Sequence, residues 1–515
     1  MRRYVTSLTC LALSLSGLVF SPAQAGGDFD GTGGMVNCFS AGQVTGTFRV
    51  INKVVSENTE CTGTVTIPAS VTSIGEIAFQ DAALLTTVKF ESGSKLKSIG
   101  NSAFSNASSL TLIKFPEGLR SIGEGAFSGA ISLKAITIPA SVTRIGNNAF
   151  SSASSLTTVK FAAGSKLKYI GDYTFASATN LTSIKIPADV KSIGVSAFEG
   201  AAKLSSISAD TENKYFSSKN GVLFDKKASK LIVYPAGNKR TRYLIPTGVT
   251  KIGYGAFAYA TELSFIKIPV GVKTIETGAF FGVTKLKSIN IPASVKTIGD
   301  YPFYAATKLT SITVSKKSTS FKSIKGVLFN KKATELVWYP TGKKVTRYTI
   351  PNSVKVIGDY SFAGANKLTA IKISNKTTQI KSYAFLFTAK LKTIEIPASV
   401  TRIDEGAFYL ATELTSVKFA SGSKLKRIGK YSFTGAAKLA SIKIPASVTR
   451  IDEGAFSGAS KLSKVTFLGN APKIGDYAFG GIAAGAKAYV GKKATGFSAK
   501  GSPPRWNELK VVISE

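Results

Sequence analysis

The fold is decided by the stretch LKAITIPASVTRIGNNAF (residues 133–150), whose pattern recurs through most of the 515-residue chain. Its last residue belongs to a series of phenylalanines, each with an isoleucine five positions earlier. The fifteen members are Phe79, Phe104, Phe127, Phe150, Phe175, Phe198, Phe257, Phe280, Phe303, Phe362, Phe385, Phe408, Phe433, Phe456 and Phe479. Most successive members are separated by the same step as Phe104 and Phe127, a few by the slightly longer step from Phe79 to Phe104, and two by a much longer one. This regularity indicates a tandem repeat rather than several independent domains.

Each part of the repeated stretch has a physical interpretation. Residues 136–138 (Ile-Thr-Ile) alternate in period two, which predicts a short strand with the isoleucines inward and the threonine outward. Pro139 ends this strand, because proline cannot donate the next ladder hydrogen bond. Residues 142–145 predict a second extended piece, and a short helical turn then carries Phe150 into the core.

One repeat unit is too small to bury these apolar side chains alone, so each unit must cover its neighbour. Each fully buried Phe or Ile contributes roughly 1.5–3 kcal/mol of transfer free energy. Stacked units pair their strands in parallel and place their phenylalanines in one continuous column. The sequence therefore predicts a solenoid that is mainly β, with a parallel β-sheet on one face. Short extended segments and helical turns, some of them short helices, are expected on the other face.

The two longest intervals contain insertions, near residues 210–246 and 315–351, that match each other at a constant offset. Both carry the string Gly-Val-Leu-Phe, at 221–224 and at 326–329. In each insertion two apolar runs flank a short polar turn, which predicts a β-hairpin. Because the two insertions match at a constant offset, we infer that a larger block of the gene was duplicated.

The pattern L-x-x-I-x-I-P…I-G-x-x-A-F resembles the BspA-like class of bacterial leucine-rich repeats, and the resemblance covers about residues 65–479. It implies a leucine-rich-repeat solenoid over residues 65–480. The resemblance also implies a secreted or surface protein. Some members of this family are adhesins. The departures are mild: Glu276, Ser382, Asp404 and Asp452 replace the turn glycine, and at Asp404 and Asp452 the string becomes Ile-Asp-Glu-Gly-Ala-Phe.

Residues 1–25 are typical of a secretory signal peptide. Arg2 and Arg3 precede an apolar stretch, and Ala23-Gln24-Ala25 supplies the small-x-small cleavage pattern, so we expect cleavage after Ala25. The alternative is a membrane anchor, but the apolar stretch is shorter than the roughly 20 residues that a spanning helix needs. We therefore expect a secreted or cell-surface protein with no transmembrane segment after signal removal.

The two ends of the solenoid need caps, because a bare terminal coil exposes an apolar face and a strand edge. We expect a linker and cap at residues 26–64 and a second cap at residues 481–515. Cys38 and Cys61 form an even pair in an exported chain and predict a disulfide. Closing a loop of that size contributes about 3 kcal/mol. The alternative, a metal site, has no His or third Cys to complete it.

Composition excludes most chemistry. The chain has no His, so it has no imidazole base, no Ser-His-Asp triad and none of the usual zinc ligand sets. Its Asp and Glu residues are scattered, and we find no phosphate-binding loop or nucleophile elbow. We therefore expect no catalytic residues, no metal and no cofactor, and we do not expect an enzyme.

The charge balance is strongly basic, with 66 Lys and Arg against 29 Asp and Glu and a formal net charge of +37. Eight strands carry an outward lysine at their middle position. These are Lys89, Lys114, Lys160, Lys185, Lys267, Lys372, Lys418 and Lys443. Such a lysine ladder concentrates positive potential on one face. An alternative interpretation is that these lysines only keep an exposed sheet soluble.

The sequence thus supports two functions. The first is a non-enzymatic binding or adhesion protein whose repeat face holds a protein or an anionic polysaccharide; the second is a structural surface or matrix solenoid without a specific ligand. Nucleic acid is a weaker partner, because outward aromatics for base stacking are rare on the sheet. We expect a monomer. A tyrosine series two positions before the repeat phenylalanine is expected to pack between adjacent coils: Tyr173, Tyr301, Tyr360, Tyr383, Tyr431 and Tyr477.

Overall fold

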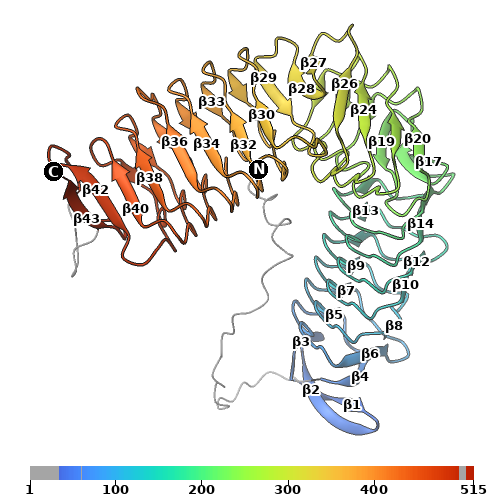
Figure 1. Cartoon of the computed structure of the whole chain (residues 1–515). Helices are drawn as coiled ribbons and strands as arrows, with labels where there is room; N and C mark the ends of the chain where they lie inside the picture. Colours follow the sequence, from blue (N-terminus) through green and yellow to red (C-terminus); the bar gives the residue numbers. More distant parts are fainter. Residues whose placement is uncertain (1–33, 60, 498–505, 515) are drawn as a thin grey trace.

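The computed structural model describes residues 34–59, 61–497 and 506–514. The expected signal peptide, its cleavage site and residues 26–33 lie outside the described residues. The described chain winds into a single file of stacked coils, and the file bends where the two insertions lie, in the green and yellow part of the molecule (Figure 1). This is the predicted mainly β solenoid.

Most coils contribute one longer strand to a parallel array that we name the long-strand sheet. Its side chains alternate between buried and exposed, as Ala135–Ile138 illustrates with its two buried isoleucines. The sheet is interrupted at the insertions and at three further places, between residues 113 and 135, 267 and 288, and 419 and 441. Its strands are β4 (Gly63–Ile67), β6 (Leu85–Phe90), β8 (Leu112–Ile113), β10 (Ala135–Ile138), β12 (Thr158–Phe161), β14 (Ser183–Ile186), β16 (Ser206–Ala209), β20 (Arg242–Leu244), β22 (Phe265–Lys267), β24 (Ser288–Ile291), β26 (Ser311–Val314), β30 (Arg347–Thr349), β32 (Ala370–Lys372), β34 (Thr393–Ile396), β36 (Ser416–Phe419), β38 (Ser441–Ile444), β40 (Lys464–Phe467), β42 (Lys487–Gly491) and β43 (Lys510–Ser514).

The second extended piece of each coil is a much shorter strand, and these strands form the short-strand sheet. Its isoleucines pair in register from coil to coil, for example Ile122 with Ile145 and Ile145 with Ile170. The strands are β5 (Ser73–Ile74), β7 (Ser98–Ile99), β9 (Ser121–Ile122), β11 (Arg144–Ile145), β13 (Tyr169–Ile170), β15 (Ser192–Ile193), β21 (Lys251–Ile252), β23 (Thr274–Ile275), β25 (Thr297–Ile298), β31 (Val356–Ile357), β33 (Gln379–Ile380), β35 (Arg402–Ile403), β37 (Arg427–Ile428), β39 (Arg450–Ile451) and β41 (Lys473–Ile474).

The expected helical turns are not helices, and the part of the chain that the structure describes contains no helix. Around Phe127 the residues two before and two after it, Gly125 and Gly129, have φ of 60° and 72°. This left-handed backbone interrupts the helical path, so alternate N–H groups point toward the next coil instead of bonding within the turn. The N–H of Phe127 donates to the carbonyl of Ala149 in the next coil at 2.7 Å, while Ala130 donates back to Phe127 at 3.2 Å. The prediction of short helices was therefore wrong.

The repeat phenylalanines are buried and stacked, with ring centroids 4.8 Å to 5.8 Å apart within each run. The stack has three runs rather than the one continuous column that we predicted: 79–198, 257–303 and 362–479. It breaks at the insertions, where each inserted segment supplies a tyrosine that begins the next run instead of stacking on Phe198 or Phe303. Tyr234 stacks on Phe257 at 5.3 Å, and Tyr339 stacks on Phe362 at 5.1 Å.

Each insertion forms three antiparallel strands, one more than the predicted hairpin. In the first, β17 (Phe216–Lys219) pairs with β18 (Val222–Asp225), which pairs with β19 (Lys230–Val233). The second repeats this with β27 (Phe321–Ile324), β28 (Val327–Asn330) and β29 (Glu335–Trp338). The last strand of each insertion then joins the short-strand sheet in parallel, so the coil stack continues.

The turn glycine of the repeat is required by close approach between coils. A Cβ added to Gly146 would lie 2.6 Å from the backbone nitrogen of Glu124 and 2.6 Å from the carbonyl carbon of Gly123 in the preceding coil. At Gly146 a residue without a side chain is therefore needed for the two backbones to come this close.

At the N-terminal end, β1 (Gly34–Ser40), β2 (Gln43–Ile51) and β3 (Val54–Thr59) form an antiparallel sheet that continues into both sheets of the solenoid. Phe48 extends the core by packing edge-on against Phe79 at 5.7 Å. Cys38 and Cys61 form a disulfide with their Cα atoms 5.4 Å apart. At the other end, β43 pairs in parallel with β42, and Trp506 packs on Phe467.

The stacked core makes a test of cooperativity possible. Phe280 lies between Phe257 and Phe303, and its ring centroid is 5.3 Å from that of each neighbour. Phe479 is the last residue of its run. We expect Phe280→Ala to lower the free energy of unfolding by about 3–5 kcal/mol. Phe479→Ala should cost less, because an end coil has a neighbour on one side only. Equal losses in chemical denaturation would contradict a one-dimensional stack.

Candidate functional site

All eight predicted lysines are exposed, and they belong to the coils of the long-strand sheet. Seven lie within its strands, and Lys114 follows β8 directly. The alternation of the strands explains this placement, because the isoleucine or valine next to each lysine points into the core. Lys160, for example, is exposed next to the buried Val159.

The register divides the lysine ladder into groups. Thr158 pairs with Ser183, so Lys160 and Lys185 lie opposite each other two positions later. Lys89 and Lys114 are neighbours in the same way. Other lysines face uncharged residues: Lys160 also pairs with Thr137, and Lys267 pairs with Leu244. Neighbouring strands are about 4.8 Å apart, and two ammonium groups at ~5 Å in water repel by only roughly 0.8 kcal/mol.

Two carboxylates that lie beside the lysine ladder were not identified from the sequence. Glu395 pairs in register with Lys372 on one side and with Lys418 on the other, so it offsets part of their charge. Lys185 forms an ion pair with Asp210 at 2.9 Å. The hydrogen bond from Lys185 lowers the pKa of Asp210. Among the residues that the structure describes, Lys185 is the one member of the eight that forms an ion pair.

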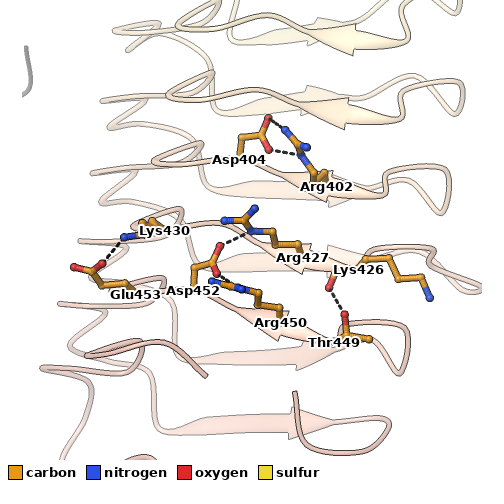
Figure 2. A network of polar contacts seen from close by, with 9 residues as sticks. All are labelled: Arg402, Asp404, Lys426, Arg427, Lys430, Thr449, Arg450, Asp452 and Glu453. Carbon is orange, nitrogen blue, oxygen red and sulfur yellow. Dashed lines mark hydrogen bonds and ion pairs between the residues drawn. The ribbon is translucent and has the colours of Figure 1, made fainter. Parts of the chain in front are cut away.

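A second basic column, which we did not predict, lies on the short-strand sheet. Arg402, Arg427, Arg450 and Lys473 pair in register along β35, β37, β39 and β41. Figure 2 shows the three arginines reaching toward two aspartates from neighbouring positions in the coils. We name this set the arginine column. Its side chains remain about half exposed, as with 44% for Arg427 and 52% for Arg450.

The aspartates of the arginine column replace the turn glycine of the repeat. Asp452 is 1% exposed and binds the Nε atoms of both Arg427 and Arg450, the former at 2.5 Å (Figure 2). Asp404 accepts from Arg402 at 2.7 Å and from Gln379 at 2.7 Å. The string Arg-Ile-Asp-Glu-Gly at 402–406 and 450–454 was the signal for this network, because it puts an acid two positions after an arginine.

The same turn position carries a charged residue in two further coils, Glu276 and Lys381. The register puts Lys381 rather than the expected Ser382 at this position, because Ile380 pairs with Ile357 and Ile403. Glu276 pairs with Lys251 at 2.6 Å and with Lys230 at 3.1 Å. Lys381 pairs with Glu335 at 2.8 Å. A coil that gives up the turn glycine therefore gains an ion pair with the outward residues of the short-strand sheet.

Three members of the tyrosine series, Tyr301, Tyr360 and Tyr383, pack on one another as the sequence predicted. Tyr360 stacks on Tyr383 at 5.2 Å and meets Tyr301 edge-on at 5.2 Å. The hydroxyl of Tyr431 donates to Glu453 at 2.5 Å rather than lying in water alone. This hydrogen bond, together with burial, raises the pKa of Tyr431 to about 12. Tyr477, in the last coil of the series, is 76% exposed.

Neither a metal cluster nor a membrane span is found among the described residues. No group of three or more Cys, Asp and Glu side chains is arranged to hold a metal ion in residues 34–59, 61–497 and 506–514. The same residues include no helix that is long and apolar enough to cross a membrane.

Parallel ladders, stacked coils and a buried phenylalanine column define a leucine-rich-repeat β-solenoid. A family model described as a BspA type leucine rich repeat region (6 copies) matches residues 49–163, 97–220, 237–337, 337–436 and 426–489. These matches span most of the chain, and the chain therefore belongs to the BspA-type leucine-rich repeat family.

Solved structures of bacterial leucine-rich repeat proteins are similar to the chain. A protein from Eubacterium ventriosum is 24% identical with a TM-score of 0.51, and the match covers 73% of this chain and 95% of that one. The pneumococcal vaccine antigen PcpA is 18% identical (TM-score 0.34; coverage 94% and 99%). A leucine rich cell surface protein from Faecalibacterium prausnitzii is 22% identical (TM-score 0.32; coverage 84% and 95%). No curated protein matches the chain.

The arginine column predicts unequal effects of two similar substitutions. Breaking a fully buried ion pair costs about 3–5 kcal/mol, and the partial exposure of the arginines reduces this for Asp452→Asn to about 2–3 kcal/mol. Asp404→Asn should cost about 1 kcal/mol, because Asp404 is 15% exposed and pairs with one arginine. Urea denaturation with an unchanged m-value would measure both. A loss from Asp452→Asn no larger than that from Asp404→Asn would show that the bridge adds no stability.

Proposed function

We propose that the protein is a non-enzymatic binding protein of the bacterial cell surface whose long-strand sheet holds an anionic polysaccharide or an acidic protein surface. The observation that carries this proposal is the lysine ladder. Its eight exposed ammonium groups lie on one sheet, and among the described residues only Lys185 of the eight is ion-paired. The expected signal peptide and the family resemblance support the surface location.

An extended polyanion suits this sheet better than a compact ligand. The lysines recur over many coils, so each contact is weak and the whole array binds through many simultaneous contacts. The neighbours Lys89 and Lys114 supply local density of positive charge, because neither is in an ion pair among the described residues. Binding of this kind weakens steeply as salt screens exposed charges.

Nucleic acid is supported less well than polysaccharide. Single-strand binders supply free aromatic faces on which bases stack. Phe265, an outward aromatic on this sheet, is covered by the guanidinium of Arg242 at 4.1 Å from the ring centroid. Tyr489 has the ammonium of Lys464 over its ring at 4.6 Å. These two rings are therefore occupied by the protein's own cations.

A structural role without a specific ligand is the second candidate. Glu395 between Lys372 and Lys418 favours it, because a carboxylate at the centre of a polyanion site weakens binding. Exposed lysines off the sheet, such as Lys166 and Lys424, favour it as well, because they indicate a general basic surface.

The two candidates differ in a binding experiment with matched charge changes. Hyaluronan, polygalacturonate and duplex DNA are titrated into the full chain at low and at high ionic strength. We expect binding of at least one polysaccharide at low salt, and at least a tenfold loss in the variant with glutamine at positions 160, 185, 418 and 443. That loss equals about 1.4 kcal/mol.

The control variant carries Lys166→Gln, Lys168→Gln, Lys424→Gln and Lys426→Gln. These four exposed lysines lie in the turns that follow β12 and β36, so the control removes equal charge from the same part of the solenoid. An equal loss in both variants would mean that net charge, rather than the sheet, determines binding. If none of the three polymers binds at low salt, the proposal is wrong.

A further inference from the structure

The first insertion leaves a gap in a hydrogen-bond ladder that is complete in regular coils. In a regular coil three N–H groups, two positions before the phenylalanine, at it and two after it, donate to the next coil. For Gly125, Phe127 and Gly129 these bonds measure 2.7 Å, 2.7 Å and 2.8 Å. They join the turn segments of neighbouring coils as the strands are joined in the sheets.

In the coil of Phe198 the three equivalent N–H groups have no such partner. The backbone amides of Ser196, Phe198 and Gly200 donate to no carbonyl in the described part of the chain. The hydroxyl of Ser196 is also buried there; no partner lies at hydrogen-bond distance, although it is near enough to Glu199 to lower the pKa of that carboxyl. Since a buried polar group without a partner costs free energy, this concentration of open donors needs an explanation.

The missing partners follow from the path of the inserted segment. After β19, Tyr234 donates to the carbonyl of Ala256 at 2.7 Å, as a repeat phenylalanine would. The chain then leaves the turn side, and the N–H of Gly237 bonds back to Leu204 at 2.8 Å. This segment therefore does not supply a full turn against the coil of Phe198. The carbonyl of Ala258, whose counterparts in regular coils accept an N–H, is open among the described residues for the same reason.

A cavity of about 110 Å³ lies at this gap. Its lining includes Ile193, Ser196, Phe198, Val233 and Ala258. Glu199 lines it too, and burial raises the pKa of this carboxyl, with the nearby Ser196 side chain partly opposing the increase. The cavity therefore combines apolar walls with backbone donors, one hydroxyl and one backbone acceptor, which is the composition of a small-ligand site.

The second insertion shows that the architecture alone does not make this cavity. At the matching places of the duplicated block it carries Tyr301, Tyr304, Trp338 and Tyr360 in place of Ser196, Glu199, Val233 and Gly255. There the rings pack on one another: Tyr301 meets Tyr360 at 5.2 Å, and Trp338 meets Phe303 at 6.3 Å. The duplicated block thus has one gap that aromatic rings fill and one that small and polar residues leave open.

We propose that this cavity, which we name the cleft of the first insertion, binds a short extended segment of another polypeptide. The carbonyls of that segment would accept from the amides of Ser196 and Phe198 and from the hydroxyl of Ser196, and one of its N–H groups would donate to the carbonyl of Ala258. A peptide supplies donors and acceptors in alternation, as the missing backbone would have done, and it completes the ladder by strand addition. This site is separate from the lysine ladder and does not depend on it.

A simple anion fits the cleft less well than a peptide. It would satisfy the open N–H groups, but it offers no donor to Ala258 and would approach the Glu199 carboxyl in a place with little water. A buried carboxylate repels a second negative charge more strongly than an exposed one does. A neutral amide avoids this repulsion and meets both kinds of open backbone group.

The test uses the full chain and acetyl-triglycine N-methylamide, a blocked neutral peptide. In ¹H–¹⁵N spectra we expect saturable shifts at the amides of Ser196 and Phe198. The pair Ser196→Tyr and Glu199→Tyr, which copies the second insertion, should weaken binding at least tenfold. Ser196→Ala should weaken it about threefold to tenfold. Should the tyrosine pair fail to fold, as judged by its denaturation midpoint, Ser196→Ala still decides the outcome.

The matched control is Ser102→Ala. Ser102 holds the same repeat position in an unbroken coil, where its N–H already donates to Glu124 at 2.7 Å, so binding should not change. The proposal is overturned if the blocked peptide shifts neither amide, if acetate or N-acetylglucosamine binds more tightly than the peptide, or if the Ser102 and Ser196 variants behave alike.

Discussion

Every coil of this protein depends on the next for both its core and its backbone. In the turn segment the N–H groups of one coil point forward, as Phe127 does toward Ala149, while at the short strand the following coil donates backward, as Gly146 does to Ile122. Each coil is thus hydrogen-bonded in both directions, and its phenylalanine is buried only when both neighbours are present. The interior is fixed by this mutual dependence, so the outward side chains are free to vary.

That freedom explains where charge is found. Outward positions on the long-strand sheet hold lysines, and the four coils that lack a turn glycine hold Glu276, Lys381, Asp404 and Asp452. The loss of glycine is tolerated in these coils because the new side chain gains an ionic partner on the short-strand sheet. The lysines lack such partners, apart from Lys185 with Asp210 among the described residues. The outward cations of the short-strand sheet are therefore partly neutralised by acids in the turn position, and most lysines of the long-strand sheet are not.

The sequence was sufficient for the fold because burial selects apolar residues at fixed spacing, and fifteen copies of Ile and Phe make that spacing visible. It was not sufficient for the turn before Phe150, since a pattern of Ala and Phe with small residues suits a helix as well as a turn. The left-handed residues that exclude the helix are glycine in some coils and Asn, Ser or Tyr in others, as at Asn148 and Tyr173. No single residue type marks the position.

The candidate sites could also be predicted only in part from the sequence. Alternation predicted that Lys418 faces outward, but only the register shows that Glu395 lies next to it. The arginine column was missed because its strands are too short to display alternation, although the acid in place of glycine at Asp452 was a usable signal.

The cleft beside Ser196 has a different origin. It arises because the inserted segment supplies less than a full turn against the coil of Phe198. In a one-dimensional stack any segment shorter than a full coil leaves open donors on one neighbour and open acceptors on the other, so an insertion creates a site at the point where the repeat fails. Whether the site survives depends on the side chains around it: Tyr301 and Trp338 close the second gap, while Ser196 and Val233 leave the first one open. Recognition there is geometric and should respond little to salt, whereas a lysine sheet acts through long-range charge that salt screens. We propose that two surfaces with such different physics would let one solenoid hold a polymer and a peptide independently.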